Sequence, residues 1–145
     1  MNVPIQKLRP GAKIPTRGSL QAAGYDLYAC LEQDTLTIPA HETGKIPTGI
    51  ALAIPQGYFG AMFARSGLAT KQGLRPANCV GVVDSDYRGE CLIFLHNDSD
   101  QPRCIANGDR VAQLVLLPYL SAEFQETDTL EETLRGAGGF GSTGK

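Results

Sequence analysis

Glycine and proline punctuate this chain along its whole length and limit the secondary structure that it can form. The 145 residues include 17 glycines and 9 prolines, and the prolines repeatedly interrupt any helical pattern. Between them lie short apolar or alternating runs, which are typical of strands. The predicted strands are residues 25–30, 35–38, 45–54, 58–63, 79–83, 91–96 and 111–117. Many short strands with turn signals between them predict an all-β barrel or sandwich.

Three further segments complete the expected organisation. One short helix is predicted over residues 67–72, with Ser66 as its N-cap and Gly73 at its end. Residues 119–135 contain no glycine or proline, but Thr127 and Thr129 weaken the helical pattern, and we expect this stretch to be extended or irregular. Residues 136–145 contain five glycines and cannot form a core element alone. This tail is either disordered or becomes ordered on a ligand or on a neighbouring subunit.

Composition bounds the class of protein. Hydrophobic residues make up 42% and charged residues 19%, which predicts one globular domain with its own core. The net charge of −2 argues against a general nucleic-acid binder, which needs a strongly basic surface. It leaves room for a small pocket in which a few arginines converge on one anion. No stretch of about 18 apolar residues is present, so neither a membrane span nor an export signal is expected.

The cysteines and histidines do not form a metal-binding pattern. Four cysteines occur without C-x-x-C spacing, and the chain has only two histidines. A domain that builds its own core has little need of disulfides. The sequence therefore predicts reduced thiols and a cytoplasmic location, with no metal held directly by side chains.

Five short segments carry residue types that suggest chemistry at a phosphate. In chain order they are Ala22-Ala23-Gly24-Tyr25-Asp26-Leu27, then Ala64-Arg65-Ser66-Gly67-Leu68-Ala69, then Asn78 to Glu90 with its core Val83-Asp84-Ser85-Asp86-Tyr87-Arg88-Gly89-Glu90, then Gly108-Asp109-Arg110-Val111-Ala112-Gln113-Leu114, and finally Arg135-Gly136-Ala137-Gly138-Gly139-Phe140-Gly141-Ser142-Thr143-Gly144.

Each segment has a structural interpretation beside the functional one. Arg65, Ser66 and Gly67 supply charge, donors and close backbone approach for a phosphate, or simply begin a short helix. Asp84 follows a strand and either accepts a proton from water or belongs to a hairpin turn. Asp26 is either a partner for a hydrated metal or an ordinary polar strand residue. Gln113 lies in an apolar strand and either joins a core hydrogen-bond network or holds a water.

The five segments, in this order, resemble the motifs of the trimeric deoxyuridine triphosphate pyrophosphatase (dUTPase) family. The similarity extends from about residue 8 to residue 144. One departure is Ala64, where the family usually has proline. The resemblance implies a jelly-roll-like β-barrel over residues 1–135 and a glycine-rich arm, residues 136–145, that is exchanged between the subunits of a homotrimer. It also implies active sites that lie between subunits.

The resemblance assigns an activity and roles to individual residues. The reaction is hydrolysis of dUTP to dUMP and pyrophosphate, which keeps uracil out of DNA and supplies dUMP for thymidylate synthesis. Asp84 would activate the water that attacks the α-phosphorus, and Gln113 would contact the phosphates and help to fix that water. Asp26 would steady water ligands of Mg²⁺, the implied cofactor, which would sit on the three phosphates. Arg65, Ser66 and Gly67 would bind phosphate, as would Arg135 together with Ser142 and Thr143 of the arm. Gly141 of the arm would be a further substrate-binding residue.

The same resemblance implies how the base and sugar would be selected. Asn78 and the backbone of Val82, Val83 and Asp84 would pair with uracil and leave no room for the thymine methyl group. Tyr87 would pack under the deoxyribose and exclude a 2′-hydroxyl, and Phe140 would stack on uracil. Two alternatives stay open from the residues alone: a dCTP deaminase of the same fold, and a non-catalytic trimer that binds nucleotides or proteins.

Overall fold

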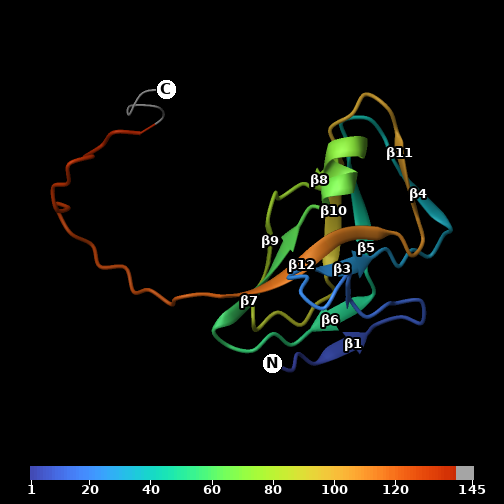
Figure 1. The fold of residues 1–145 in the computed structure, drawn as a ribbon, viewed down its shortest axis with the longest axis horizontal. Coiled ribbons are helices and arrows are strands. Elements are labelled where there is room, and N and C mark those ends of the chain that lie inside the picture. Colours follow the sequence, from blue (N-terminus) through green and yellow to red (C-terminus); the bar gives the residue numbers. More distant parts are fainter. Residues whose placement is uncertain (140–145) are drawn as a thin grey trace.

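The computed structural model describes residues 1–139, and these residues form strands connected by turns and loops (Figure 1). The elements are β1 (Ile5–Lys7), β2 (Thr16–Arg17), β3 (Tyr25–Tyr28), β4 (Thr35–Ile38), β5 (Thr43–Pro47), β6 (Ile50–Leu52), β7 (Tyr58–Phe63), η1 (Leu68–Gln72), β8 (Leu74–Pro76), β9 (Gly81–Val83), β10 (Leu92–Asn97), β11 (Arg103–Ala106) and β12 (Arg110–Pro118). The all-β prediction is confirmed, and the arrangement fits a jelly-roll-like barrel.

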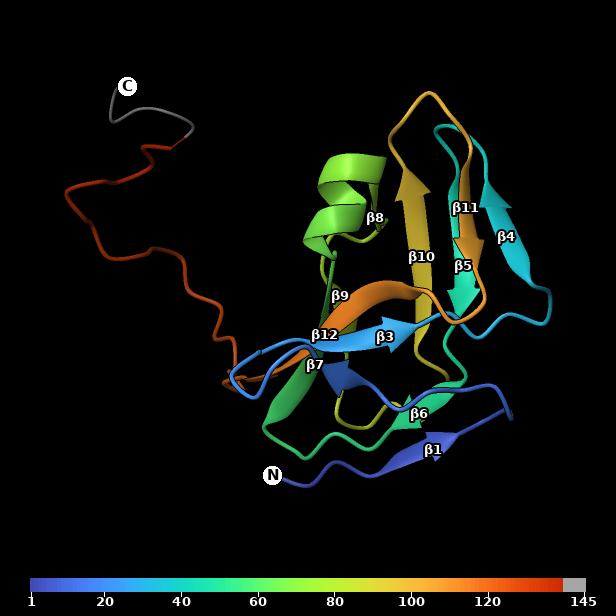
Figure 2. The ribbon, with the colours of Figure 1, turned by 45° about the vertical axis from the view of Figure 1, so that its right-hand side comes forward.

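The largest sheet has five strands in the order β2-β3-β12-β7-β9, and every neighbouring pair is antiparallel. Smaller sheets of order β5-β10-β8, β11-β4 and β1-β6 pack around it (Figure 2). The central strand β12 sets the register of the functional segments, because Gln113 lies opposite Asp26 of β3 and opposite Phe63 of β7. Strands β3 and β7, which are far apart in the sequence, therefore both lie beside Gln113.

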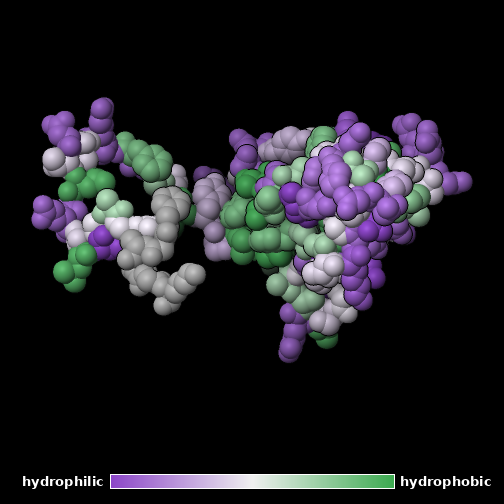
Figure 3. All heavy atoms as spheres, turned by 90° about the horizontal axis from the view of Figure 1, so that it is seen from above, coloured by the Kyte–Doolittle hydropathy of each residue, from purple (hydrophilic) through white to green (hydrophobic). Residues whose placement is uncertain are grey.

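The core consists of the inward-facing side chains of these strands. Alternating burial along β10 shows one face of that strand turned inward, as expected for a half-buried strand, and β12 buries Val111, Ala112 and Leu114. The largest apolar side chains that are almost fully buried are Leu27, Ile38, Ile46, Ile50, Leu74, Ile93, Leu95, Ile105 and Val111. Figure 3 shows further apolar residues gathered on the side of the body from which the chain leaves after β12.

Several predicted strands have different bounds in the structure. The predicted strand over residues 45–54 is two strands, β5 and β6, because Gly49 adopts a left-handed backbone (φ 70°) that ends the extended run. The strands β1, β2, β8 and β11 were absent from the prediction. They contain only two to four residues each and lack a clear alternation that a sequence pattern could reveal.

The short helix is present, but its predicted cap is wrong. The helical segment η1 has no side-chain cap, and its first turn already closes through the bond from the Ala69 amide to the Arg65 carbonyl. The Ser66 hydroxyl is therefore too late in the chain to cap it. The predicted end at Gly73 is confirmed, since this glycine is left-handed (φ 68°) and its amide donates to the Leu68 carbonyl.

Beyond β12 the described chain leaves the body as an extended, irregular arm, as expected for residues 119–135 (Figure 1). The Tyr119 amide still donates to the Gly57 carbonyl at 3.0 Å. Farther along, Leu120 and Phe124 are 96% and 99% exposed, so this stretch buries little apolar surface on its own chain. In the part of the chain that the structure describes, no helix has the length and apolar character needed to cross a membrane.

Candidate active site

The first two motifs and the fourth meet in one depression of about 690 Å³, which we call the arginine pocket. Asp26 comes from β3, Arg65 and Ser66 from the turn after β7, and Arg110 and Gln113 from β12. The lining is completed by Gly18, Ala22, Ala23, Gly24, Phe63, Gly67 and Val115. The central position of β12 between β3 and β7 is what brings these segments together.

An acid held between two arginines gives the arginine pocket its charge. Arg65 Nε donates to Asp26 Oδ1 at 2.7 Å, and Arg110 Nη1 donates to Asp26 Oδ2 at 3.2 Å. The Asp26 side chain is only 15% exposed, whereas that of Arg110 is 53% exposed. Two guanidinium groups against one carboxylate leave a net positive charge, which suits an anion.

Gln113 links two of the motif loops. Its Nε2 donates to the Ala64 carbonyl at 2.8 Å, so the side chain is tied to the turn that carries Arg65. Its Oε1 lies so close to Gly24 that a Cβ there would collide with it. A side chain at residue 24 would therefore displace the Gln113 amide, which is a member of a hydrogen-bond network at the pocket.

The side chains of the arginine pocket fit a hydrated Mg²⁺. Among the described residues, no group of three or more His, Cys, Asp or Glu side chains could hold a metal. Magnesium usually keeps several waters and binds through phosphates and one or two carboxylates. A carboxylate has about four acceptor positions, and the arginines occupy two of those on Asp26, so it retains capacity for metal-bound water.

The third motif forms a second depression of about 270 Å³, the hairpin pocket. It brings together five of the predicted residues, Asn78, Val82, Val83, Asp84 and Tyr87. Val82 and Val83 belong to β9, the edge strand of the large sheet. Asn78 precedes this strand, and Asp84 and Tyr87 follow it. Their neighbours in the lining are Met62, Glu90, Cys91, Leu92 and Phe94. Burial, and secondly the charge of Glu90, raises the pKa of the Cys91 thiol to about 11, so this thiol stays neutral.

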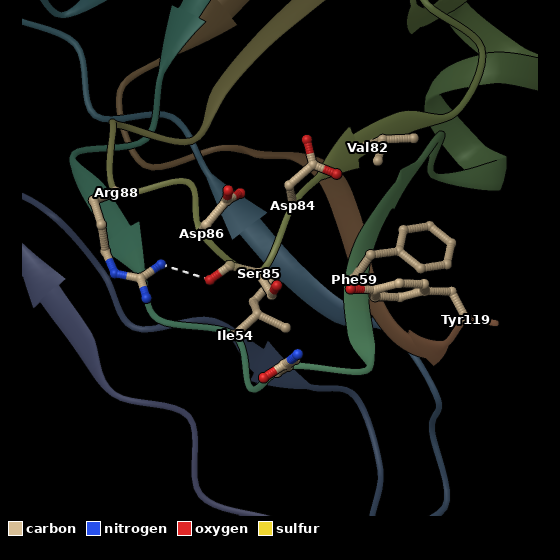
Figure 4. Close-up of a pocket in the computed structure, with 9 residues that line it drawn as sticks. Ile54, Phe59, Val82, Asp84, Ser85, Asp86, Arg88 and Tyr119 are labelled. Carbon is tan, nitrogen blue, oxygen red and sulfur yellow. Dashed lines mark hydrogen bonds between the residues drawn. The ribbon is translucent and has the colours of Figure 1, made fainter. Parts of the chain in front are cut away.

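A network of backbone contacts shapes the turn that follows Asp84. The Tyr87 amide donates to the Asp84 carbonyl at 3.2 Å, and Arg88 Nη1 donates to the carbonyls of Ser85 and Tyr87 at 2.7 and 2.9 Å. Asp84 also lines a larger hollow of about 890 Å³ on the outer side of the turn, with Phe59 and Tyr119 (Figure 4). The exposed carboxylate of Asp84 is therefore at the rim of two depressions.

The two pockets do not meet within one chain. Among the described residues they share no lining side chain. Phe63 lines the arginine pocket and its neighbour Met62 lines the hairpin pocket. Met62 belongs to the buried core, whereas Val82 of the hairpin pocket lies opposite Ala61 and therefore on the same face of the sheet as Phe63. The two pockets are separate depressions of the same sheet. Of the predicted arm residues, Arg135 donates to the Gly138 carbonyl at 2.8 Å within the extended segment, while Phe140, Gly141, Ser142 and Thr143 lie outside the described residues.

Two residues of these pockets went unassigned from the sequence. Arg110 lies in the fourth segment without an assigned role, and its pairing with Asp26 places it in the arginine pocket. Glu90 ended the third motif without a role, yet its Oε1 accepts from the Gly49 amide at 2.7 Å and its Oε2 from Arg9 Nη2 at 2.8 Å. An acid directly before the apolar run 91–95 was the one available signal for such a buried contact.

Comparison with known proteins places this geometry in a family. The family model described as dUTPase matches residues 11–144. A deoxyuridine 5′-triphosphate nucleotidohydrolase of Desulfitobacterium hafniense is 53% identical over 91% of this chain and 87% of its own. A Staphylococcus bacteriophage 80alpha dUTPase mutant solved with dUpNHpp is 27% identical, with a TM-score of 0.89 over 99% of both chains. A phage phi11 dUTPase mutant described with a structural Mg(II) ion is 25% identical, with a TM-score of 0.81 over 91% of this chain and all of that one. The chain therefore belongs to the dUTPase family of hydrolases.

Proposed function

We propose that this protein hydrolyses dUTP to dUMP and pyrophosphate, using the arginine pocket for the phosphates and the hairpin pocket for the nucleoside. The observation that carries the proposal is the pairing of a positively charged depression with a separate one that ends in a single exposed carboxylate, Asp84. The relatives named for this reaction, and the related phage enzyme solved with dUpNHpp, support the substrate.

The proposed chemistry begins at Asp84. A water donates a hydrogen bond to its carboxylate, attacks the α-phosphorus, and transfers a proton to Asp84 as pyrophosphate leaves. The carboxylate suits this role because the described chain gives it no arginine or lysine partner, so it stays available as an acceptor. Asn78 and the backbone at Val82 and Val83 would hold uracil beside it, with Tyr87 under the deoxyribose.

The arginine pocket would stabilise charge on the phosphates. Arg65 is held in place by Asp26 and still has its terminal nitrogens free of that bond, so it can bind phosphate together with Ser66 and the backbone at Gly67. Gln113 would orient the phosphates beside Ala64. When bound, Mg²⁺ would add charge neutralisation on the triphosphate, and Asp26 would accept hydrogen bonds from its waters.

A complete site would need more than one copy of the chain. Because the two pockets share no lining side chain among the described residues, we infer that they face one substrate across an interface between copies of the chain. We extend the proposal to a homotrimer in which residues 136–145 form an arm that reaches a neighbouring subunit, where Arg135, Gly141, Ser142 and Thr143 grip phosphate and Phe140 stacks on uracil. A cytoplasmic location is part of the proposal and agrees with four free thiols.

Pyrophosphate release from dUTP, measured with Mg²⁺ and with a chelator, tests the proposed function. Asp84→Asn should remove most of the turnover and leave binding of dUTP nearly intact, because the carboxylate acts mainly in the transition state. Asp86→Asn, two residues farther along the same turn, is the matched control and should keep turnover near that of the wild type. Normal turnover in Asp84→Asn, or ammonia released from dCTP instead of pyrophosphate from dUTP, would refute the proposal.

A further inference from the structure

The ring of Tyr87 folds back over the chain that follows it. Its hydroxyl donates to the Glu90 carbonyl at 3.1 Å, three residues on, and the side chain remains 44% exposed along the hairpin pocket. This path runs directly over Gly89. A Cβ built at Gly89 would collide with the Tyr87 hydroxyl and lie only 2.9 Å from ring atom Cε2. The observed ring position therefore requires that residue 89 has no side chain.

The backbone at Gly89 does not itself require glycine. Gly89 is absent from the described glycines with positive φ, which are Gly49, Gly57, Gly73, Gly108 and Gly136. An alanine there is compatible with the backbone, and its Cβ would meet only the far end of the tyrosine side chain. That end can turn away. Gly89→Ala should therefore displace the ring of Tyr87 and leave the fold in place.

The carbonyl that receives the Tyr87 hydroxyl is firmly fixed to the body of the domain. The Glu90 carboxylate, 17% exposed, accepts from the Gly49 amide and from Arg9. At the next residue the Cys91 amide donates to the Ile50 carbonyl at 2.9 Å, and its carbonyl accepts from the buried Thr48 hydroxyl at 2.6 Å. With that carbonyl fixed, the space above Gly89 decides where the ring can lie.

We propose that Gly89 is a specificity-determining residue, which selects 2′-deoxyribose over ribose by setting the position of the Tyr87 ring. The inference rests on the proposed function, in which this ring packs under the sugar. A ring held down against Gly89 presents its face to the pocket at one fixed depth. A methyl group at residue 89 would displace that face of the ring. The ring would then no longer exclude a 2′-hydroxyl, and ribonucleotides would be accepted.

The test is the ratio of kcat/KM for dUTP to kcat/KM for UTP, which does not depend on the fraction of enzyme that is folded. We expect Gly89→Ala to lower this ratio about ten-fold or more, toward the value of Tyr87→Ala, which lacks the ring. Gly11→Ala is the matched control, because a Cβ there would make only an ordinary contact, 3.5 Å from Cys30 Sγ. It should leave the ratio unchanged.

The outcomes separate this inference from the proposed function. If Tyr87→Ala loses selectivity while Gly89→Ala keeps the wild-type ratio within about two-fold, Gly89 does not set the ring position and the inference is overturned. If Gly89→Ala does not fold, the double variant Tyr87→Ala/Gly89→Ala decides, because it removes the ring that the new Cβ would meet: recovery of the fold supports the inference, and a double variant that also fails to fold overturns it. A wild-type protein without dUTP hydrolysis overturns both.

Discussion

We predict that the loss of the Asp26 ion pairs lowers the stability of the protein. Asp26→Asn keeps the shape of the side chain but removes the negative charge between Arg65 and Arg110. The amide oxygen can still accept from one arginine, whereas the amide nitrogen would face the other as donor against donor. Two guanidinium groups would then lie in the arginine pocket without a counter-charge. The free energy of unfolding should decrease, and Arg65 should no longer be held in position for phosphate.

The size of the loss follows from burial. The bond from Arg65 lies between side chains that are 26% and 15% exposed, and a hydrogen bond between charged groups contributes about 1.5–3 kcal/mol. The contact from Arg110 is more than half exposed on the arginine side and adds well under about 1 kcal/mol. We expect Asp26→Asn to lower the free energy of unfolding by about 2–3 kcal/mol, which a domain with about 5–15 kcal/mol survives.

Urea unfolding followed by circular dichroism measures this change, with the wild-type m-value as the check on two-state behaviour. The matched control is Asp98→Asn. Asp98 accepts two bonds from Arg75, at 2.7 and 3.0 Å, but these side chains are 44% and 39% exposed. Exposure should make the loss in Asp98→Asn clearly smaller, despite its two short bonds. An equal or larger loss in the control would show that burial does not decide the strength of these ion pairs.

Three further predictions concern the arm, a buried thiol and a buried amide. Ending the chain at Arg135 should keep the oligomeric state seen by light scattering and greatly reduce dUTP turnover; unchanged turnover would show that residues 136–145 are not needed. Burial raises the pKa of Cys91 from 9.0 to about 11, so a thiol reagent at about pH 8 should label the exposed cysteines, Cys79 and Cys104, first. The free energy of unfolding should fall as the pH rises from 9.0 to about 11, because only the unfolded chain ionises the Cys91 thiol in that range. Asn97→Ala should lower the free energy of unfolding by about 3 kcal/mol, since the fully buried amide donates to three carbonyls. A decrease of less than about 0.5 kcal/mol, the size expected for a substitution on the surface, would contradict this.

The sequence predicted those strands whose side-chain pattern is long enough to read. The predicted strands 35–38 and 58–63 match β4 and β7 residue for residue, and the predicted strand 111–117 differs from β12 only at its ends. The pattern fails where pairing alone defines a strand. Thr16 and Arg17 are both exposed and count as β2 only because they pair with β3, so no local signal marks them.

The candidate site shows the same division between local and long-range information. Asp84 and Tyr87 lie in one turn, and their proximity is visible in the sequence as a single motif. The pairing of Asp26 with Arg110 joins residues 84 positions apart, and it depends on the antiparallel register of β3 and β12. Such contacts follow from the pairing of strands, which single-residue propensities do not encode.

Mixing two inactive variants tests whether the two pockets cooperate between copies of the chain. Asp84→Asn disables the hairpin pocket, and Arg65→Gln disables the arginine pocket while Arg110 still pairs with Asp26. In any ring of identical subunits whose sites combine one pocket from each neighbour, an equal mixture refolded together should recover about a quarter of the wild-type turnover, since one site in four receives both intact halves. If each chain held its own complete site, every site would keep one defect and the mixture would stay inactive. Activity that remains absent after verified subunit exchange would refute the inference that the two pockets serve one substrate across an interface.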